Sequence, residues 1–193
     1  MRRLCVYCGS SPGNQRDYTK AAKNLARALV KKKIDLVYGG ASVGLMGVLA
    51  DTVLAEGGHV IGIIPQALVD KEVAHTGLSD LRVVTSMHER KTLMAELSDG
   101  FIALPGGVGT LEELFEVLTW ALLGLHQKPC GLLNIRHYYS GLIGFLDHAV
   151  SEEFIRDAHR AMLLVEEEPE RLLERFECYK APVVAKWVDL SRT

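Results

Sequence analysis

Residues 101–113 read FIALPGGVGTLEE, an apolar run followed by a glycine-rich turn and an acidic segment with spaced leucines. Four consecutive apolar residues, Phe101–Leu104, are typical of a strand that is buried on both faces. Apolar residues at helical spacing predict a helix over Leu111–Leu125. Strand, glycine turn and helix in this order form half of a β-α-β unit, the building block of parallel sheets.

The same alternation of strand and helix extends over most of the 193 residues. The expected strands are Leu4–Cys8, Leu36–Tyr38, Val60–Ile64, Leu81–Val84, Phe101–Leu104, Cys130–Leu133 and Leu163–Val165. The expected helices are Gln15–Lys33, Gly44–Ala55, Met87–Leu97, Leu111–Leu125, Tyr139–Val150 and Pro169–Cys178, with a polar loop over Pro65–Asp80. This order predicts an α/β fold: a doubly wound, mainly parallel, Rossmann-like sheet with helices on both faces. We expect one nucleotide-binding catalytic domain over residues 1–180 and assign no role to the tail, 181–193.

The composition is that of an ordinary soluble protein. Hydrophobic residues make up 48%, charged residues 24%, and the net charge is only −2. Because there is no excess of basic residues, we expect no nucleic-acid partner. No apolar stretch reaches the length of a signal peptide or a membrane span, so we expect a cytoplasmic protein with no membrane partner.

Four cysteines are present, and two of them form a C-x-x-C pair. Cys5 and Cys8 lie in an expected strand, where an offset of three residues places them on opposite faces. No second pair completes a tetrahedral zinc site. We therefore predict buried free thiols for Cys5, Cys8, Cys130 and Cys178.

Two further glycine-rich turns follow expected strands: CGSSPG over residues 8–13 and YGGASVGLMG over residues 38–47. Parallel sheets bind ligands beyond the carboxyl ends of their strands, and glycines let backbone N–H groups approach an anion. Three such turns at one edge favour a nucleotide site, and Ser10, Gly39 and Gly40 are candidate substrate contacts. Neither the dinucleotide fingerprint nor the P-loop motif occurs literally, which disfavours a dinucleotide or a P-loop triphosphate.

Glu113 has two interpretations. Thr110 and Glu113 have the spacing of a capping box, in which both side chains satisfy free N–H groups at a helix start. A carboxylate next to a bound phosphate would also be placed to act on the attached sugar. The residues alone leave this choice open.

Ser86 and Glu89 form a second plausible capping box. Arg90 and Lys91 then place two cations early in a helix, where the helix dipole disfavours them unless an anion compensates. His88-Glu89 begins like a zinc-protease motif, but position 92 is Thr, which excludes it. We expect neither a metal nor a cofactor.

The helix expected over Leu111–Leu125 is apolar nearly all round. One apolar stripe would be enough for a helix that packs on the core with one face. Val117, Trp120 and Leu123 add apolar surface outside that stripe. Such a helix must be covered on both sides. We favour a homodimer built around it, with coverage by the C-terminal segment carrying Trp187 as the alternative.

These motifs resemble those of the LONELY GUY (LOG) proteins, the cytokinin riboside 5′-monophosphate phosphoribohydrolases. Residues 105–113 match the hallmark P-G-G-x-G-T-x-x-E, and residues 87–91 match M-x-x-R-K. The segment 39–47 is similar to the family's G-G-x-x-x-G-L-M-G. The resemblance runs from about Arg3 to Val165.

The resemblance implies hydrolysis of the N-glycosidic bond of an adenosine-type 5′-monophosphate, giving the free base and ribose 5-phosphate. It implies that Arg90 and Glu113 are the catalytic pair and that the enzyme is a dimer or a larger assembly. The implied substrate contacts are Glu72, Lys91, Gly106, Gly107, Val108, Gly109, Thr110, Leu111, Glu112 and Thr119.

An ionised Glu113 could stabilise the positive charge that develops on the ribose or orient the attacking water. The role of Arg90 stays open between positioning the substrate and assisting the leaving base. The main alternative is a noncatalytic nucleotide or cofactor carrier with the same fold. A pyridoxal-dependent decarboxylase would need a larger fold, and a dehydrogenase would need the missing fingerprint and a second domain.

Overall fold

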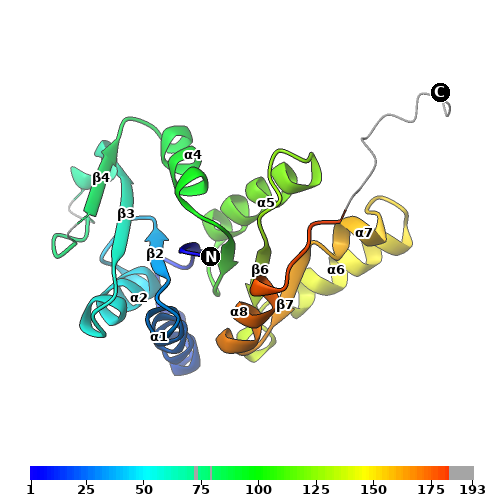
Figure 1. Ribbon diagram of the computed structural model, residues 1–193, viewed down its shortest axis with the longest axis horizontal. Coiled ribbons are helices and arrows are strands. Elements are labelled where there is room, and N and C mark those ends of the chain that lie inside the picture. Colours follow the sequence, from blue (N-terminus) through cyan, green and yellow to red (C-terminus); the bar gives the residue numbers. More distant parts are fainter. Residues whose placement is uncertain (72–73, 79, 183–193) are drawn as a thin grey trace.

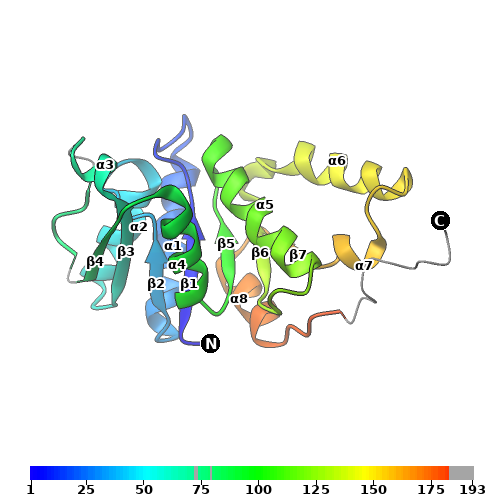
Figure 2. The ribbon, with the colours of Figure 1, turned by 90° about the horizontal axis from the view of Figure 1, so that it is seen from above.

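The computed structural model describes residues 1–71, 74–78 and 80–182. Seven parallel strands form one sheet in the order β4-β3-β2-β1-β5-β6-β7, which Figure 2 shows from left to right. The strands are β1 (Arg3–Tyr7), β2 (Asp35–Tyr38), β3 (Val60–Pro65), β4 (Asp80–Val84), β5 (Phe101–Ala103), β6 (Cys130–Leu133) and β7 (Leu163–Glu166). The expected doubly wound parallel sheet is confirmed.

Helices cover both faces of this sheet. They are α1 (Arg16–Lys31), α2 (Gly44–Ala55), α3 (Gln66–Val69), α4 (Met87–Leu97), α5 (Val108–Leu122), α6 (Ser140–Ser151), α7 (Asp157–Arg160) and α8 (Pro169–Glu177), with a 3-10 turn, η1, over Ile135–His137. Figure 1 shows α1, α2 and α8 on one side of the sheet and α4 and α5 on the other. Among the helices of the described residues, none is both long and apolar enough to cross a bilayer.

Strand β1 separates two hydrophobic cores. Leu4, Val6 and Cys8 pack with α1, α2 and α8, whereas Cys5 and Tyr7 pack with α4, α5 and α6. This alternation follows from the two-residue period of a strand, and every residue of β1 after Arg3 is buried. The two thiols of the C-x-x-C pair therefore face opposite cores, as predicted.

The order of strands reverses direction at β1. The chain runs outward from β1 through β2 and β3 to β4, then returns to place β5 on the other side of β1. Loops that leave β1 and β5 consequently turn to opposite faces and open a crevice between them, which is where doubly wound sheets bind ligands. The first and third glycine turns of the sequence lie at this crevice.

Some expected boundaries are wrong. The helix expected over Leu111–Leu125 runs from Val108 to Leu122, because Gly107 in extended conformation starts it and Gly124, with φ of +75°, ends it. The polar loop after β3 contains the short helix α3, and the short elements η1 and α7 were not expected.

The prediction of four buried thiols is wrong for Cys178. The structure contains four free cysteines, and Cys5, Cys8 and Cys130 are buried, but Cys178 is exposed. It lies just beyond α8, whose buried positions are Leu172, Leu173 and Phe176. Cys178 is the C-cap of α8, two residues beyond Phe176, and lies off the buried stripe of the helix.

Candidate active site

The turn between β5 and α5 presents backbone N–H groups. Gly107 is the N-cap of α5 and has no side chain that could accept hydrogen bonds from the first amides of the helix. The first helical donor is the N–H of Leu111, which bonds to the Gly107 carbonyl at 3.2 Å. The N–H groups of residues 107–110 thus precede the helical ladder at the positive end of the helix dipole. Gly107, Val108 and Gly109 are exposed, so an anion can reach this turn.

Gly106 is required where this turn meets β1. A Cβ on Gly106 would lie 2.7 Å from the Thr110 Cβ and 2.8 Å from the Gly9 nitrogen. The Gly9 N–H donates to the Pro105 carbonyl at 3.1 Å, which ties the turn after β1 to the turn after β5. The two glycine turns form one continuous surface at the switch point of the sheet.

The turn after β2 joins the same surface. The Leu45 N–H, in the first turn of α2, donates to the Gly9 carbonyl at 3.0 Å. Gly44 has φ of +59°, and the backbone of Ser10 occupies the space that its side chain would need. All three expected glycine turns therefore meet, and Ser10 lies where two of them touch.

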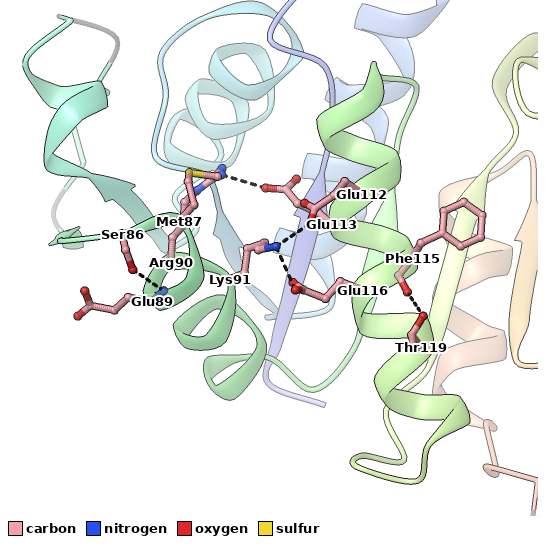
Figure 3. Close-up of polar contacts among 10 residues, drawn as sticks. All are labelled: Ser86, Met87, Glu89, Arg90, Lys91, Glu112, Glu113, Phe115, Glu116 and Thr119. Carbon is pink, nitrogen blue, oxygen red and sulfur yellow. Dashed lines mark hydrogen bonds and ion pairs between the residues drawn. The ribbon is translucent and has the colours of Figure 1, made fainter. Parts of the chain in front are cut away.

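A buried ion pair lies between α4 and α5. The Arg90 Nη1 is 3.0 Å from the Glu113 Oε1, and the two side chains are only 10% and 11% exposed (Figure 3). The Arg90 Nε donates to the Ile63 carbonyl at 3.2 Å. Gly39 leaves the space that the guanidinium fills, since a Cβ there would collide with it. The expected pair is thus in contact, and Gly39 has a definite reason to be glycine.

The carboxylate of Glu113 is not a helix cap. Because α5 begins at Val108, Thr110 lies within the first helical turn and is buried, and the Glu113 carboxylate faces Arg90. Burial raises the pKa of Glu113 above the ordinary value, while Arg90 lowers it and nearby Glu112 raises it further. The first interpretation of Glu113, the capping box, is therefore excluded.

The second capping box is confirmed in part. The Ser86 hydroxyl accepts from the Glu89 N–H at 3.1 Å and caps α4. The Glu89 carboxylate, however, accepts from the N–H and hydroxyl of Thr85, at 2.8 and 2.7 Å, rather than from Ser86. These bonds lower the pKa of Glu89. Glu89 is thus a capping residue of the helix that carries Arg90.

Lys91 contacts acidic side chains of α5. Its ammonium is 2.5 Å from the Glu112 Oε1 and 3.0 Å from the Glu116 Oε1 (Figure 3), and the lysine side chain is only 11% exposed. The bond to Glu112 is the main reason why the pKa of Lys91 is raised. The anion that compensates Lys91 in this structure is therefore carboxylate from its own chain.

The expected contact Thr119 lies apart from the ion pair. Thr119 is exposed, donates its hydroxyl to the Phe115 carbonyl at 2.6 Å, and lies six residues beyond Glu113, about 9 Å along the helix axis. Figure 3 shows it well away from the Arg90–Glu113 pair. Glu72 lies outside the described residues. Leu111 is half-buried behind the turn.

A hollow of about 260 Å³ opens beside the glycine turns. Its lining comes from residues 9–13 and 105–107, together with Tyr18, Leu45 and Tyr138. The Arg90–Glu113 pair lies outside this lining, on the α4–α5 side. The glycine surface is thus flanked by an aromatic hollow on one side and a buried carboxylate on the other.

Some residues that hold these turns carry no motif in the sequence. The His75 N–H donates to the Gly40 carbonyl at 2.9 Å, and its Nε2 is 2.9 Å from the Asp51 Oδ1 on α2. Tyr138 lines the hollow and bonds to the turn after β5. The only sequence signal for His75 is that it is a polar residue in a loop. Tyr138 has no signal in the local sequence pattern.

The geometry combines amides for an anion with a carboxylate for a developing cation. Across the described ranges, no group of three or more His, Cys, Asp or Glu side chains is placed to hold a metal ion. A substrate with a phosphate at one end and an electron-poor carbon near it would match both features.

Comparison with known proteins identifies the family. Residues 46–176 match the family model described as "Possible lysine decarboxylase". The rice protein named "Probable cytokinin riboside 5′-monophosphate phosphoribohydrolase LOGL6" is 51% identical over 178 residues, 92% of this chain and 71% of the relative. The chain belongs to the LOG family. The Arabidopsis thaliana LOG-family protein "Cytokinin riboside 5′-monophosphate phosphoribohydrolase LOG5" is 49% identical over 93% of this chain and 78% of the relative.

Solved structures show how widely the fold of this LOG-family chain is shared. The molybdenum cofactor carrier protein of Chlamydomonas reinhardtii superposes with a TM-score of 0.69 at 18% identity, over 92% of this chain and 99% of that chain. The molybdenum cofactor binding protein of Rippkaea orientalis gives 0.67 at 21% identity, over 92% and 97%. At these identities the likeness extends to the fold alone.

Proposed function

We propose that this protein hydrolyses the N-glycosidic bond of adenosine-type 5′-monophosphates, including cytokinin riboside 5′-monophosphates, to the free base and ribose 5-phosphate. The observation that carries the proposal is the buried Arg90–Glu113 pair next to the glycine turn. Glu113 follows Gly109 by four residues, about one helical turn. A nucleotide whose phosphate binds the turn would bring its ribose to that carboxylate.

The reaction breaks the bond between C1′ of the ribose and the ring nitrogen of the base. The bonding electrons leave with the base, water adds to C1′, and a proton from water ends on the base. Positive charge builds on the ribose in the transition state, and an ionised Glu113 would stabilise it more than it stabilises the ground state. The same carboxylate could hold the attacking water.

Arg90 favours the ionised form of Glu113 and so opposes the effect of burial on its pKa. Burial alone favours the neutral acid, and the guanidinium at 3.0 Å opposes that effect. The bond from Arg90 to the Ile63 carbonyl and the fit against Gly39 fix the guanidinium in place. We infer that Arg90 acts first on the charge of Glu113 and leaves part of its guanidinium for the ribose or the base.

The second candidate is a carrier without catalytic activity. Structures named as molybdenum cofactor carriers share the fold, but they are 18–21% identical. The relatives at about half identity are instead named phosphoribohydrolases. Burying a carboxylate and its arginine partner costs free energy, and a role in hydrolysis would explain why such a pair is present.

We further propose that the protein is a homodimer assembled around α5. Leu123 and Leu125, just beyond the C-terminal end of this helix, are 56% and 70% exposed. Covering them would remove apolar surface from water. Trp187, the alternative cover for this helix, lies outside the described residues.

A cytoplasmic location is part of the same proposal. Three buried cysteines remain free thiols, and the exposed Cys178 is free as well. Thiols persist where the surroundings are reducing. Fractionation of the source cells with detection of this chain would test the location.

The test of the reaction is direct. Purified protein is incubated with AMP and with an N-prenylated AMP, and the products are separated by chromatography. The proposal expects free base and ribose 5-phosphate in equal amounts. Nucleotide that binds and is recovered unchanged would favour the carrier, and release of inorganic phosphate would indicate a different reaction.

A further inference from the structure

Three consecutive backbone carbonyls at the turn after β5 each accept a hydrogen bond. The Leu104 carbonyl accepts from the Tyr139 hydroxyl at 2.7 Å, and the Pro105 carbonyl accepts from the Gly9 N–H at 3.1 Å. The Gly106 carbonyl accepts from the Tyr138 hydroxyl at 2.6 Å. Two adjacent tyrosines thus hold the backbone on either side of Pro105.

The bond to the Gly106 carbonyl also sets the direction of a donor. In a trans peptide, the C=O of one residue and the N–H of the next point in opposite directions. The structure has no cis peptide bond among the described residues. The Gly107 N–H therefore points away from Tyr138, and it can turn toward Tyr138 only if that hydroxyl loses its partner.

This peptide unit needs to be held because glycine lies on both sides of it. Gly106 and Gly107 lack the Cβ atoms that restrict the backbone of other residues, so the peptide between them can flip at low cost. A flipped peptide would present a carbonyl oxygen where the N–H had been. An oxygen facing a phosphate repels it, so the flip would convert a binding contact into an unfavourable one.

The position of Tyr138 is itself built into the fold. Arg136 and His137, which precede it, have φ of 52° and 59°, in the left-handed region that residues other than glycine seldom adopt. The Tyr139 N–H donates to the Asn134 Oδ1 at 2.7 Å, and the rings of Tyr138 and Tyr139 meet edge to face. Backbone strain persists only where the surrounding structure holds it in place, and it is common at functional sites. In this loop the strained backbone places the two tyrosine rings.

We propose that Tyr138 is a positioning residue for the 5′-phosphate. Its hydroxyl holds the Gly106 carbonyl, and the Gly107 N–H is thereby kept in the orientation that binds the phosphate. The proposal rests on the proposed function for its ligand, a nucleoside 5′-monophosphate. It adds a contribution from the loop after β6, which carries none of the motifs of the sequence.

The test separates the phosphate from the rest of the ligand. Tyr138→Phe removes the hydroxyl and keeps the ring, and the matched control Tyr179→Phe removes a hydroxyl from a half-buried ring that packs on the core after α8 and does not line the hollow. Binding of AMP and of adenosine is measured by calorimetry, each variant being combined with Glu113→Gln so that the ligand is not consumed.

We expect Tyr138→Phe to weaken AMP binding about tenfold and to change adenosine binding less than about twofold, because only the phosphate contacts the turn. Tyr179→Phe should change neither. In the otherwise unaltered enzyme, Tyr138→Phe should raise KM and leave kcat nearly unchanged. Equal weakening of AMP and adenosine, or no weakening of AMP, would overturn the proposal.

This comparison remains decisive if the hydrolase proposal fails. A protein that binds AMP without cleaving it still shows whether the Tyr138 hydroxyl acts on the phosphate. Thermal unfolding of each variant checks for a general loss of structure, which would lower the affinity for AMP and adenosine together.

Discussion

Arg90 and Glu113 are charged residues in a place that water barely reaches. Taking two charges out of water is costly, and their attraction repays the cost only with good geometry and further hydrogen bonds. Here the pair is 3.0 Å apart, and Arg90 has a second partner in the Ile63 carbonyl. Removing one member leaves the other buried without its counter-charge, so the isosteric Glu113→Gln separates loss of charge from loss of shape, and Arg90→Ala is compared with Arg90→Lys.

Glu113→Gln removes the negative charge and keeps the shape. We expect kcat to fall by about 10²–10³-fold, since a charge that stabilises the transition state is lost, while AMP binding changes little. Steady-state kinetics and calorimetry on the same preparation check both parts. Normal turnover in this variant would contradict the assignment of Glu113 and return it to a structural role.

The pH dependence follows from the same pair. Burial raises the pKa of Glu113, and an activity that needs the ionised carboxylate is lost as the pH falls through that raised value. The acid limb of kcat/KM should thus lie above the ordinary glutamate pKa of about 4.3. Arg90→Ala should move the limb to higher pH, because Arg90 lowers the pKa of Glu113, and Arg90→Lys should move it less.

The Arg90 comparison has a second measurement that does not need turnover. Carbon NMR of the labelled carboxylates follows the titration of Glu113 in each variant. A titration midpoint that stays in place, or falls, when the guanidinium is removed would contradict the proposed role of Arg90.

At the level of elements, α5 depends on how the glycine turn meets β1. Gly106 lies against Thr110 on one side and Gly9 on the other, so the start of the helix has no spare room. The helix carries Glu113, and its first amides are the proposed phosphate site. We therefore expect packing and phosphate binding to be coupled at this turn.

Gly106→Ala should disturb both. Its Cβ would lie 2.7 Å from the Thr110 Cβ, and overpacking of this kind costs about 1–3 kcal/mol in the free energy of unfolding. The control is Gly144→Ala on the exposed part of α6, where nothing lies within 4 Å of the new Cβ and helix propensity predicts a gain of about 0.5–1 kcal/mol. Denaturant unfolding measures both. Equal stability of the two variants would contradict the close contact at Gly106.

The sequence predicted the elements better than their ends. Strands of consecutive apolar residues were found at the right places, and α2, α4 and β6 have the predicted bounds. The start of α5 was missed because its first residues, Val108 and Gly109, look like part of the turn. Propensity cannot show that Gly107 caps the helix, since the cap depends on the backbone angles of a residue without a side chain.

The site was predicted to the extent that local motifs describe it. Arg90 and Glu113 stand in separate motifs, and only the fold brings α4 against α5 to pair them. His75 and Tyr138 escaped notice because each reaches a backbone carbonyl of a distant segment, at Gly40 and at Gly106. Contacts of that kind depend on the path of the chain and have no sequence spacing.

At the level of the whole molecule, the exposed end of α5 predicts assembly. Sedimentation should give twice the chain mass of 21.3 kDa. Leu125→Asp should shift the protein to a monomer, because a carboxylate would have to be buried in the interface. Phe154→Asp is the matched control: this side chain is 85% exposed but follows α6. A monomeric unaltered protein, or dissociation by the Phe154 change alone, would contradict an interface centred on α5.

We propose that the amides at the start of α5 hold the 5′-phosphate and thereby present the ribose to Glu113. A crystal structure of the Glu113→Gln variant with AMP tests it most directly. We expect phosphate oxygens within hydrogen-bonding distance of the N–H groups of residues 107–110, with C1′ next to the substituted side chain. A phosphate bound elsewhere, with this turn closed by its own side chains, would show that α5 does not hold the phosphate.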